Sequence, residues 1–465
     1  MGNNPSTEEL LEWDRQYIWH PFTPMKAWMA KQDVPVITHG QDEFLFDTEG
    51  RRYIDGVSSL WCNIHGHRVP EIDEAVKKQL EQIAHSTLLG LCNVPSIILA
   101  KRLVQIMPPG LTRVFYSDDG STAVEAACKL ACQFWANQGK PQRSRFICFD
   151  EAYHGDTVGA VSLGGIPMFH EAYRRLCFPV DRVKPPLLPA FAPLDAAVTP
   201  PAPAAVRDLN WIASIEKLLV ENPDQYAGIF IEPVVQGAGG MLMHPPGTLR
   251  ALRELADRHD LLLIFDEVMT GFGRTGRMFA CEHEKVSPDL LCLSKGLTAG
   301  YMPLGATLVN DRVFNAFYAD PREGKTFYHG HTFTGHPLAC AAAIASLDLF
   351  DSRRLLEHVA ALKTILAAEL APLRRHPNVG DVRQVGLIAA VDIVQDRTTG
   401  EKFDYQRRVG GALCTMMRSR GVFLRPLGDV LVVMPPLATR PDNIRILAQA
   451  VVKSLEDDLP VVLRN

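Results

Sequence analysis

Short apolar runs that alternate with helical segments constrain the fold of this chain more than any other feature. The clearest runs are residues 113–116, 145–149, 228–231 and 261–265, and each has a helical pattern before or after it. Strands that are apolar along their whole length are typical of parallel sheets, because helices bury both faces of such a sheet. We therefore predict an α/β fold in which helices cover a mostly parallel sheet.

The two ends of the chain carry a different pattern. Near the start, residues 43–47 and 53–55 alternate around a glycine-containing turn, which predicts a β-hairpin. Near the other end, helices alternate with strands that include residues 421–424 and 430–433. Both ends are therefore expected to belong to a smaller α+β unit.

A chain of 465 residues exceeds the size that one hydrophobic core usually supports. We predict a large domain over residues 76–344 and a smaller domain assembled from residues 1–75 and 345–465. Residues 185–203 are rich in proline and alanine and lack periodicity, which indicates a surface excursion within the large domain.

Composition excludes several classes of protein. Hydrophobic residues make up 47% of the chain and charged residues 22%, and the net charge of -5 provides no basic surface for nucleic acid. No apolar run approaches the roughly 18 residues that a membrane span needs, and the start lacks the pattern of a secretory signal. The ten cysteines form no C-x-x-C pair, which indicates a reducing compartment and no metal framework. We expect a cytoplasmic protein that binds neither nucleic acid nor membrane.

An acid and a lysine suggest the chemistry. Asp266 ends an apolar strand, where the ligands of open α/β sheets bind, and Lys295 lies in a short apolar segment further along. A lysine amine in such surroundings can form a Schiff base with pyridoxal phosphate (PLP), while a carboxylate keeps the pyridine nitrogen of that cofactor protonated. Taken singly, each has a structural explanation: an acid that caps a helix, and a lysine whose stem packs on apolar surface.

A phosphate site is indicated between the strand at 113–116 and the following helix. Gly120 permits close backbone approach, and the hydroxyls of Ser121 and Thr122 stand beside the free N–H groups of the helix start. The structural alternative is a capping box made by Ser121 or Thr122 with Glu125.

Two further residues fit a PLP enzyme. Tyr153 follows another strand and could stack on a planar ring, although a core tyrosine is the alternative. Arg425 ends a strand before a proline, where its guanidinium could bind a substrate carboxylate in a bidentate manner; a surface ion pair is the alternative.

Together these motifs resemble the class III, fold-type I PLP-dependent aminotransferases along nearly the whole chain. The class signature is matched at residues 262–268, 271–276, 288–289 and 294–296. Within the class, the chain is similar to the members that act in biotin biosynthesis. That similarity lies at residues 17–23, 58–67, 153–157, 424–428 and 434–436.

The resemblance implies roles for individual residues. Lys295 would carry the cofactor and transfer protons, Asp266 would pair with the pyridine nitrogen, and Tyr153 would stack on the ring. The phosphate would be bound by Gly120, Ser121, His331 and Thr332, with Thr332 reaching over from the second subunit of a homodimer. The substrate site would be lined by Tyr17, Leu60, Trp61, Tyr153, Gly330 and Arg425.

The implied reaction is transfer of an amino group to 8-amino-7-oxononanoate, with S-adenosylmethionine as the first choice of donor and lysine as the second. The donor stays open because some members carry two tryptophans where this chain has Leu60 and Trp61, and a proline where it has His331. An ω-amino acid:pyruvate aminotransferase is the alternative within the fold. A nucleotide-binding dehydrogenase or a non-catalytic binding protein is the alternative from another class, although no dinucleotide fingerprint occurs.

Overall fold

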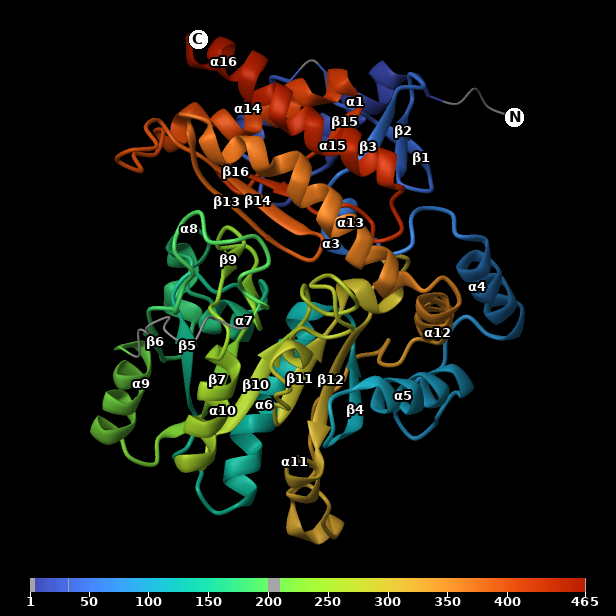
Figure 1. The fold of residues 1–465 in the computed structure, drawn as a ribbon. Coiled ribbons are helices and arrows are strands. Elements are labelled where there is room, and N and C mark those ends of the chain that lie inside the picture. Colours follow the sequence, from blue (N-terminus) through green and yellow to red (C-terminus); the bar gives the residue numbers. More distant parts are fainter. Residues whose placement is uncertain (1–4, 32, 200–209, 465) are drawn as a thin grey trace.

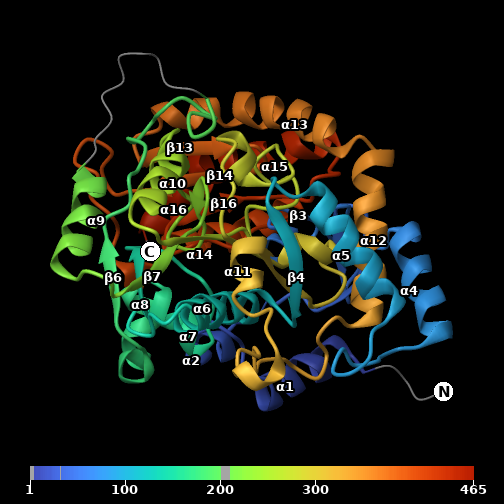
Figure 2. The same ribbon diagram turned by 90° about the horizontal axis from the view of Figure 1, so that it is seen from below.

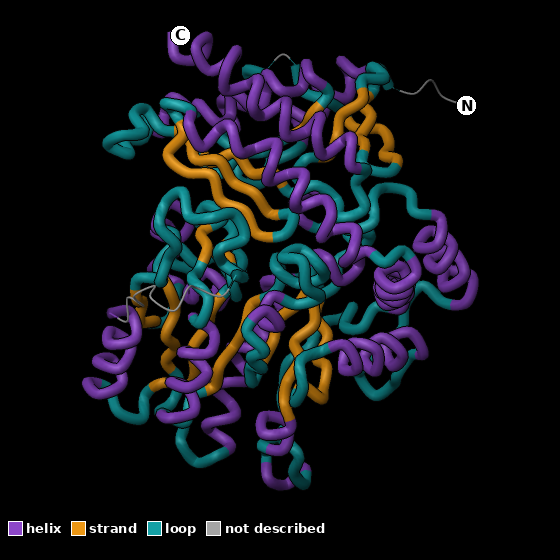
Figure 3. The backbone as a smooth tube through the Cα atoms, in the orientation of Figure 1, coloured by secondary structure: helices purple, strands orange, loops and turns teal. Residues whose placement is uncertain are grey.

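The computed structural model describes residues 5–31, 33–199 and 210–464. Its centre is a seven-stranded sheet in the order β4-β12-β11-β10-β7-β5-β6, with the strands enclosed by helices (Figure 3). All neighbours pair in parallel except β12, which is antiparallel to both β11 and β4. The strands are β4 (Leu111–Ser117), β5 (Arg145–Phe149), β6 (Val180–Val183), β7 (Tyr226–Ile231), β10 (Leu262–Asp266), β11 (Leu290–Leu293) and β12 (Gly305–Asn310). The predicted α/β class with a mostly parallel sheet is confirmed.

Successive residues of the central strands pack into opposite layers. Ile264 of β10 belongs to a core with α6 (Gly120–Asn137), whereas its neighbour Leu263 belongs to a core with α10 (Thr248–Arg258). This alternation explains why the strands are apolar along their whole length. Helices of the first layer also include α7 (Val158–Leu163) and α11 (Asp311–Asn315), and those of the second α4 (Pro70–Gln82), α5 (Val94–Ile106), α9 (Asn210–Glu221) and α12 (Pro337–Ser352). Figure 2 shows α6 and α7 together on one side of the strands.

The two ends of the chain meet in a second region. The strand β15 (Val422–Phe423) pairs in parallel with β3 (Arg52–Asp55), which forms the predicted hairpin with β2 (Phe44–Asp47). Figure 1 shows the N-terminal strands in blue beside the C-terminal helices in red. This pairing supports a smaller domain built from both ends, whose boundaries at residues 75 and 345 we keep as a proposal.

The other elements of this region are short sheets and flanking helices. The strands are β1 (Ile37–Gln41), which pairs with β2, and the antiparallel set β13 (Val379–Val385), β14 (Ile388–Ile393) and β16 (Val430–Val433). The helices are α1 (Thr7–Tyr17), α2 (Met25–Met29), α13 (Leu355–Leu370), α14 (Val409–Met416), α15 (Pro441–Lys453) and α16 (Leu459–Arg464), with a π-helix at Ser454–Asp458. The remaining short elements of the described chain are α3 (Ser58–Trp61), α8 (Pro167–His170), β8 (Val235–Gln236), β9 (Leu242–Met243) and the 3-10 turns η1 (Glu171–Leu176), η2 (Ala280–His283), η3 (Lys295–Thr298), η4 (Pro321–Glu323), η5 (Ala371–Arg375), η6 (Tyr405–Arg407) and η7 (Met417–Arg420).

Two helices carry a proline in their first turn, ahead of the residues that show helical apolar spacing. The helix α4 starts at Pro70, and α5 starts at Val94, followed by Pro95, behind an Asn93 cap. Proline is favoured in the first turn, where its missing N–H needs no partner, so apolar spacing alone places these starts too late. The apolar segment before Lys295 is also a full strand, β11, at the centre of the sheet.

The described part of the proline-rich excursion, residues 185–199, contains no helix or strand. It contacts the C-terminal part of the chain. The Asp195 amide donates to the Gln384 carbonyl at 2.9 Å, and the Phe191 amide donates to Asp381 Oδ1 at 2.6 Å. The excursion therefore connects the edge of the central sheet with β13, and its residues 200–203 lie outside the described part.

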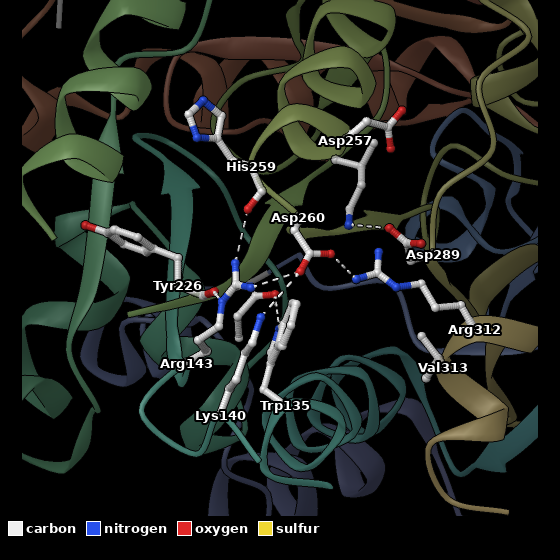
Figure 4. Close-up of polar contacts among 12 residues, drawn as sticks. Trp135, Lys140, Arg143, Tyr226, Asp257, His259, Asp260, Asp289, Arg312 and Val313 are labelled. Atoms are coloured by element: carbon white, nitrogen blue, oxygen red, sulfur yellow. Dashed lines mark hydrogen bonds and ion pairs between the residues drawn. The ribbon is translucent and has the colours of Figure 1, made fainter. Parts of the chain in front are cut away.

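A network of ion pairs and hydrogen bonds lies at the amino end of the central sheet (Figure 4). Arg143 precedes β5 and donates to the Tyr226 carbonyl at 2.9 Å and the His259 carbonyl at 3.2 Å. Asp260 precedes β10 and contacts Arg143 at 3.4 Å and Arg312 at 2.5 Å. This end of the strands is therefore held by paired charges.

Candidate active site

A pocket of about 400 Å³ opens at the carboxyl ends of the parallel strands. Its walls come from the turns that follow β4, β5, β7, β10 and β11, as expected for a ligand site in an open α/β sheet. Six of the predicted residues line it: Trp61, Gly120, Ser121, Tyr153, Asp266 and Lys295. A larger cavity, of about 1360 Å³, lies beside the proline-rich excursion and contains none of these residues.

Lys295 follows β11 and extends into the pocket. Its Nζ lies 5.6 Å from the centre of the Trp61 ring, and among the described residues it has no hydrogen bond or ion pair. Burial lowers the pKa of Lys295, and the charges of Asp266 and Glu232 oppose this shift. The amine is therefore more readily deprotonated than that of a surface lysine.

Asp266 ends β10 and is held from two sides. Its Oδ2 lies 2.7 Å from His154 Nδ1, and its Oδ1 accepts the Val268 amide at 3.0 Å. Burial acts to lower the pKa of His154, but the hydrogen bond and the charge of Asp266 outweigh it, so that the pKa is raised. His154 Nε2 is buried and has no hydrogen-bond partner within the described part of the chain. The imidazole therefore holds the carboxylate in a fixed orientation beside the pocket.

The start of α6 forms the predicted phosphate-binding end of the pocket. Asp119, not Ser121 or Thr122, caps the helix by accepting the Thr122 amide at 2.8 Å, and the hydroxyl of Thr122 is used within that cap. The capping box with Glu125 is therefore wrong, and the Thr122 hydroxyl is engaged within the Asp119 cap. Gly120 and Ser121, with N–H groups that the helix itself leaves unsatisfied, remain available to the pocket.

Two glycines permit close packing around this end of the pocket. A Cβ on Gly120 would lie 2.6 Å from Val268 Cγ1. A Cβ on Gly155, whose φ of +125° few other residues adopt, would lie 2.2 Å from Ser121 Oγ. An N-terminal helix turn without Cβ obstruction fits a phosphate group, and the neighbouring lysine and buried carboxylate fit the rest of PLP.

Tyr153 follows β5 and is fixed at three points. Its hydroxyl donates to Asp156 Oδ2 at 2.6 Å, and its amide donates to Glu232 Oε1 at 3.0 Å. Its ring lies parallel to the His170 ring, with an interplanar angle of 11°. Burial and the bond to Asp156 raise the pKa of Tyr153, which keeps the hydroxyl protonated.

The pair Leu60 and Trp61 lies on a left-handed turn. Four consecutive residues from Ser58 to Trp61 have φ between 49° and 78°, and Asp55 stabilises the turn by accepting the Ser59 amide at 2.9 Å. Residues other than glycine rarely adopt this conformation, and backbone strain of this kind is concentrated at functional sites. The turn directs Trp61 into the pocket and leaves Leu60 exposed.

Six predicted residues lie outside the pocket of this single chain, and the exposed Leu60 is one of them. Tyr17 at the end of α1 is 71% exposed, and Gly330, Thr332 and Arg425 are also exposed. Arg425 has no hydrogen bond or ion pair in the described structure. His331 approaches the predicted phosphate-binding end of the pocket, and its Nδ1 lies 2.9 Å from Asp118 Oδ2.

Sequence reasoning missed two buried groups of the site, His154 and Glu232. Glu232 accepts the amides of Tyr153 and Gly237, and burial raises its pKa to about 7. Both follow parallel strands at their carboxyl ends, and that position was the available signal. No cluster of three or more potential metal ligands occurs among the described residues, and no helix found there is long and apolar enough to cross a membrane.

The sequence model of the class-III aminotransferase family matches residues 28–455, and the chain belongs to this family. It is therefore a transaminase that acts on small molecules, and PLP is the cofactor of its class. Among known proteins, it is 51% identical over 449 residues to the adenosylmethionine-8-amino-7-oxononanoate aminotransferase of Geobacter sulfurreducens, with 97% of this chain and 98% of that protein covered. The protein of the same name from Nitratidesulfovibrio vulgaris is 48% identical, with 96% and 81% covered.

Solved structures agree with this assignment. The adenosylmethionine-8-amino-7-oxononanoate aminotransferase of Methanocaldococcus jannaschii has a TM-score of 0.90 at 38% identity and covers 97% of this chain and 99% of its own. A PLP-bound amine transaminase from an uncultivated Pseudomonas species has a TM-score of 0.86 at 34% identity, with 95% and 98% covered. The predicted family, enzyme class and cofactor are confirmed, and the dehydrogenase and non-catalytic alternatives are set aside.

Proposed function

We propose that the protein transfers an amino group to 8-amino-7-oxononanoate and so forms 7,8-diaminononanoate in biotin biosynthesis. The observation that carries this proposal is the full-length similarity, at 51% identity, to an aminotransferase named for that keto acid. S-adenosylmethionine is the proposed amino donor and lysine the second choice. The names of the relatives favour the first, whereas Leu60, Trp61 and His331 keep the second open.

The pocket residues divide the work of binding and proton transfer. When bound, PLP supplies an aldehyde that carries the amino group and a ring that accepts electrons. Asp266, oriented by His154, would hold the ring nitrogen, and Tyr153 would face the ring. Gly120 and Ser121 would bind the phosphate, together with His331 and Thr332. Lys295 would take and return a proton at its Nζ, which its lowered pKa favours.

The substrate would be bound at the outer end of the pocket by Tyr17, Leu60, Trp61, Gly330 and Arg425. The unpaired guanidinium of Arg425 suits the carboxylate of the keto acid. Trp61 would pack on the aliphatic chain of that acid, because its ring already forms an apolar wall beside Lys295.

A homodimer would complete the site. Thr332 and Gly330 are exposed and lie outside the pocket of their own chain, so that a second subunit could supply them. Large apolar side chains are also exposed nearby, including Leu89, Val94, Tyr328 and Phe333. Apolar surface of this kind is typical of a subunit interface. All ten cysteines are free, which supports the proposed location in the reducing cytoplasm.

A donor and acceptor screen tests the function. The holoenzyme would be supplied with 8-amino-7-oxononanoate and either S-adenosylmethionine or lysine, and 7,8-diaminononanoate would be measured. The alternative, an ω-amino acid:pyruvate aminotransferase, is favoured by the fold of an ω-transaminase from Thermomicrobium roseum, with a TM-score of 0.87 at 32% identity. Faster turnover of pyruvate with ω-amino acids than of 8-amino-7-oxononanoate would support this alternative and contradict the proposal.

A further inference from the structure

The segment between α1 and α2 reaches the back of the pocket wall. Phe22 in this segment packs edge-on against Phe169, with ring centres 5.3 Å apart. Phe169 in turn packs edge-on against Tyr153 at 6.2 Å. A continuous row of aromatic rings therefore connects the N-terminal segment with a side chain that lines the pocket.

A carboxylate on α1 fixes the segment that carries Phe22. Asp14 Oδ1 lies 2.9 Å from His20 Nε2, and Asp14 Oδ2 accepts the Trp28 indole N–H at 2.8 Å. The rings of His20 and Trp28 also pack together at 4.1 Å. Asp14 therefore joins the end of α1, the loop and α2 in one contact.

The Asp14 contact lies close in sequence to an unfavourable backbone conformation at Phe22. The side chains of Asp14 and His20 are only 20% and 22% exposed, so that their hydrogen bond is partly shielded from water. Phe22 has a φ of +50°, which a bulky side chain rarely adopts. Without the bonds of Asp14, we expect the loop to relax and the contact of Phe22 with Phe169 to weaken.

We propose that Asp14 is a positioning residue: through His20 and Trp28 it places Phe22 against Phe169 and so steadies the Tyr153 wall of the substrate pocket. Tyr17, one turn after Asp14 on α1, is placed by the same contact. The inference rests on the proposed function in so far as Tyr153 and Tyr17 face the substrate.

Replacing Asp14 tests the proposal with a matched control. Asp14→Ala removes the acceptor for both His20 and Trp28, whereas Asp14→Asn keeps an acceptor oxygen. Glu12→Ala, on the same helix, removes a carboxylate that has no hydrogen bond or ion pair in the described structure. We expect Asp14→Ala to raise KM for the keto acid about tenfold and to change kcat less than threefold, with most of the effect reversed in Asp14→Asn and none in Glu12→Ala.

Hydrogen exchange provides a readout that needs no substrate. In the Asp14→Ala holoenzyme, amides of residues 166–172 should exchange faster together with those of residues 15–30. The same two changes are expected in Phe22→Ala but not in Phe22→Leu, which keeps apolar contact with Phe169. Faster exchange confined to residues 15–30, with KM unchanged, would overturn the proposal. If the wild-type enzyme does not aminate 8-amino-7-oxononanoate, the proposed function fails, while exchange at residues 166–172 still decides this inference.

Discussion

The two ends of the central sheet differ in how their charged groups are paired. At the carboxyl end, Asp266 is paired with His154, but Lys295 has no hydrogen bond or ion pair in the described structure, and Glu232 accepts hydrogen bonds from backbone amides alone. At the amino end of the same strands, Arg143 donates to two carbonyls and contacts Asp260. A charged group without a counter-charge can still form a strong interaction with a ligand, whereas a group that is already paired contributes to the stability of the fold.

Burial also shifts the pKa values of two groups at the carboxyl end. In the pocket, burial lowers the pKa of Lys295 and raises that of Glu232 to about 7. Both groups are thereby moved toward neutral pH, where proton transfer is efficient. Damage at the carboxyl end should therefore affect turnover, and damage at the amino end should affect stability.

The largest effect is expected for Lys295→Ala. Loss of the amine should lower turnover by more than about a thousandfold, because proton transfer and attachment of the cofactor both depend on it. The visible absorbance that PLP acquires on binding to a lysine should disappear. The melting temperature of the apoprotein should not fall, since a buried amine without a hydrogen bond adds little to the fold. Retained turnover and absorbance would contradict the role of Lys295.

The counterpart at the amino end is Arg143→Met. The substitution leaves the carbonyls of Tyr226 and His259 without their donor, although methionine still packs on Trp135, over which the guanidinium lies at 3.7 Å. We expect the protein to lose about 3 kcal/mol of unfolding free energy. Thermal unfolding of the apoprotein measures this loss. The kcat/KM of the folded enzyme at 25 °C should stay within about twofold of wild type, and a larger change would show that the two ends are coupled.

A pH series compares two buried acids, one inside the pocket and one outside. Burial raises the pKa of Glu232 from 4.5 to about 7, and that of Glu267 likewise. Between pH 4.5 and pH 7, each of these two carboxyl groups holds a proton in the folded state that it has released in the unfolded state. Stability should therefore fall as pH rises from 4.5 to 7, by about 3 kcal/mol for each group. His154, whose pKa is also raised, acts in the same direction at higher pH.

Glu232→Gln and Glu267→Gln should each reduce this dependence when melting temperature is followed from pH 5 to pH 8. Only Glu232→Gln is expected to reduce turnover, because Glu267 accepts the amides of Ala280 and Cys281 away from the pocket. Equal loss of turnover in both variants would mean that these carboxylates act through the fold and not through the site.

The sequence predicted the carboxyl end of the sheet better than the amino end. Asp266 and Lys295 lie in a local signature, and their strands are recognisable from apolar runs alone. His154 was missed because its partner, Asp266, is 112 positions away, and Arg143 because it bonds to carbonyls, which carry no sequence pattern. The left-handed turn at Leu60 and Trp61 was also hidden, since none of its residues is glycine.

The smallest effect, and the sharpest test of the comparison, is expected for Asp260→Asn. Asp260 contacts Lys140, Arg143 and Arg312, but its side chain is 55% exposed, so that water screens these pairs. Asparagine keeps an acceptor oxygen and removes only the charge, which should lower the unfolding free energy by at most about 1 kcal/mol. The difference from wild type should shrink in 1 M salt, because exposed ion pairs are screened at that concentration. Unchanged kcat/KM alongside this salt dependence would confirm that charge at the amino end serves stability alone, whereas a loss of turnover would break the division between the two ends.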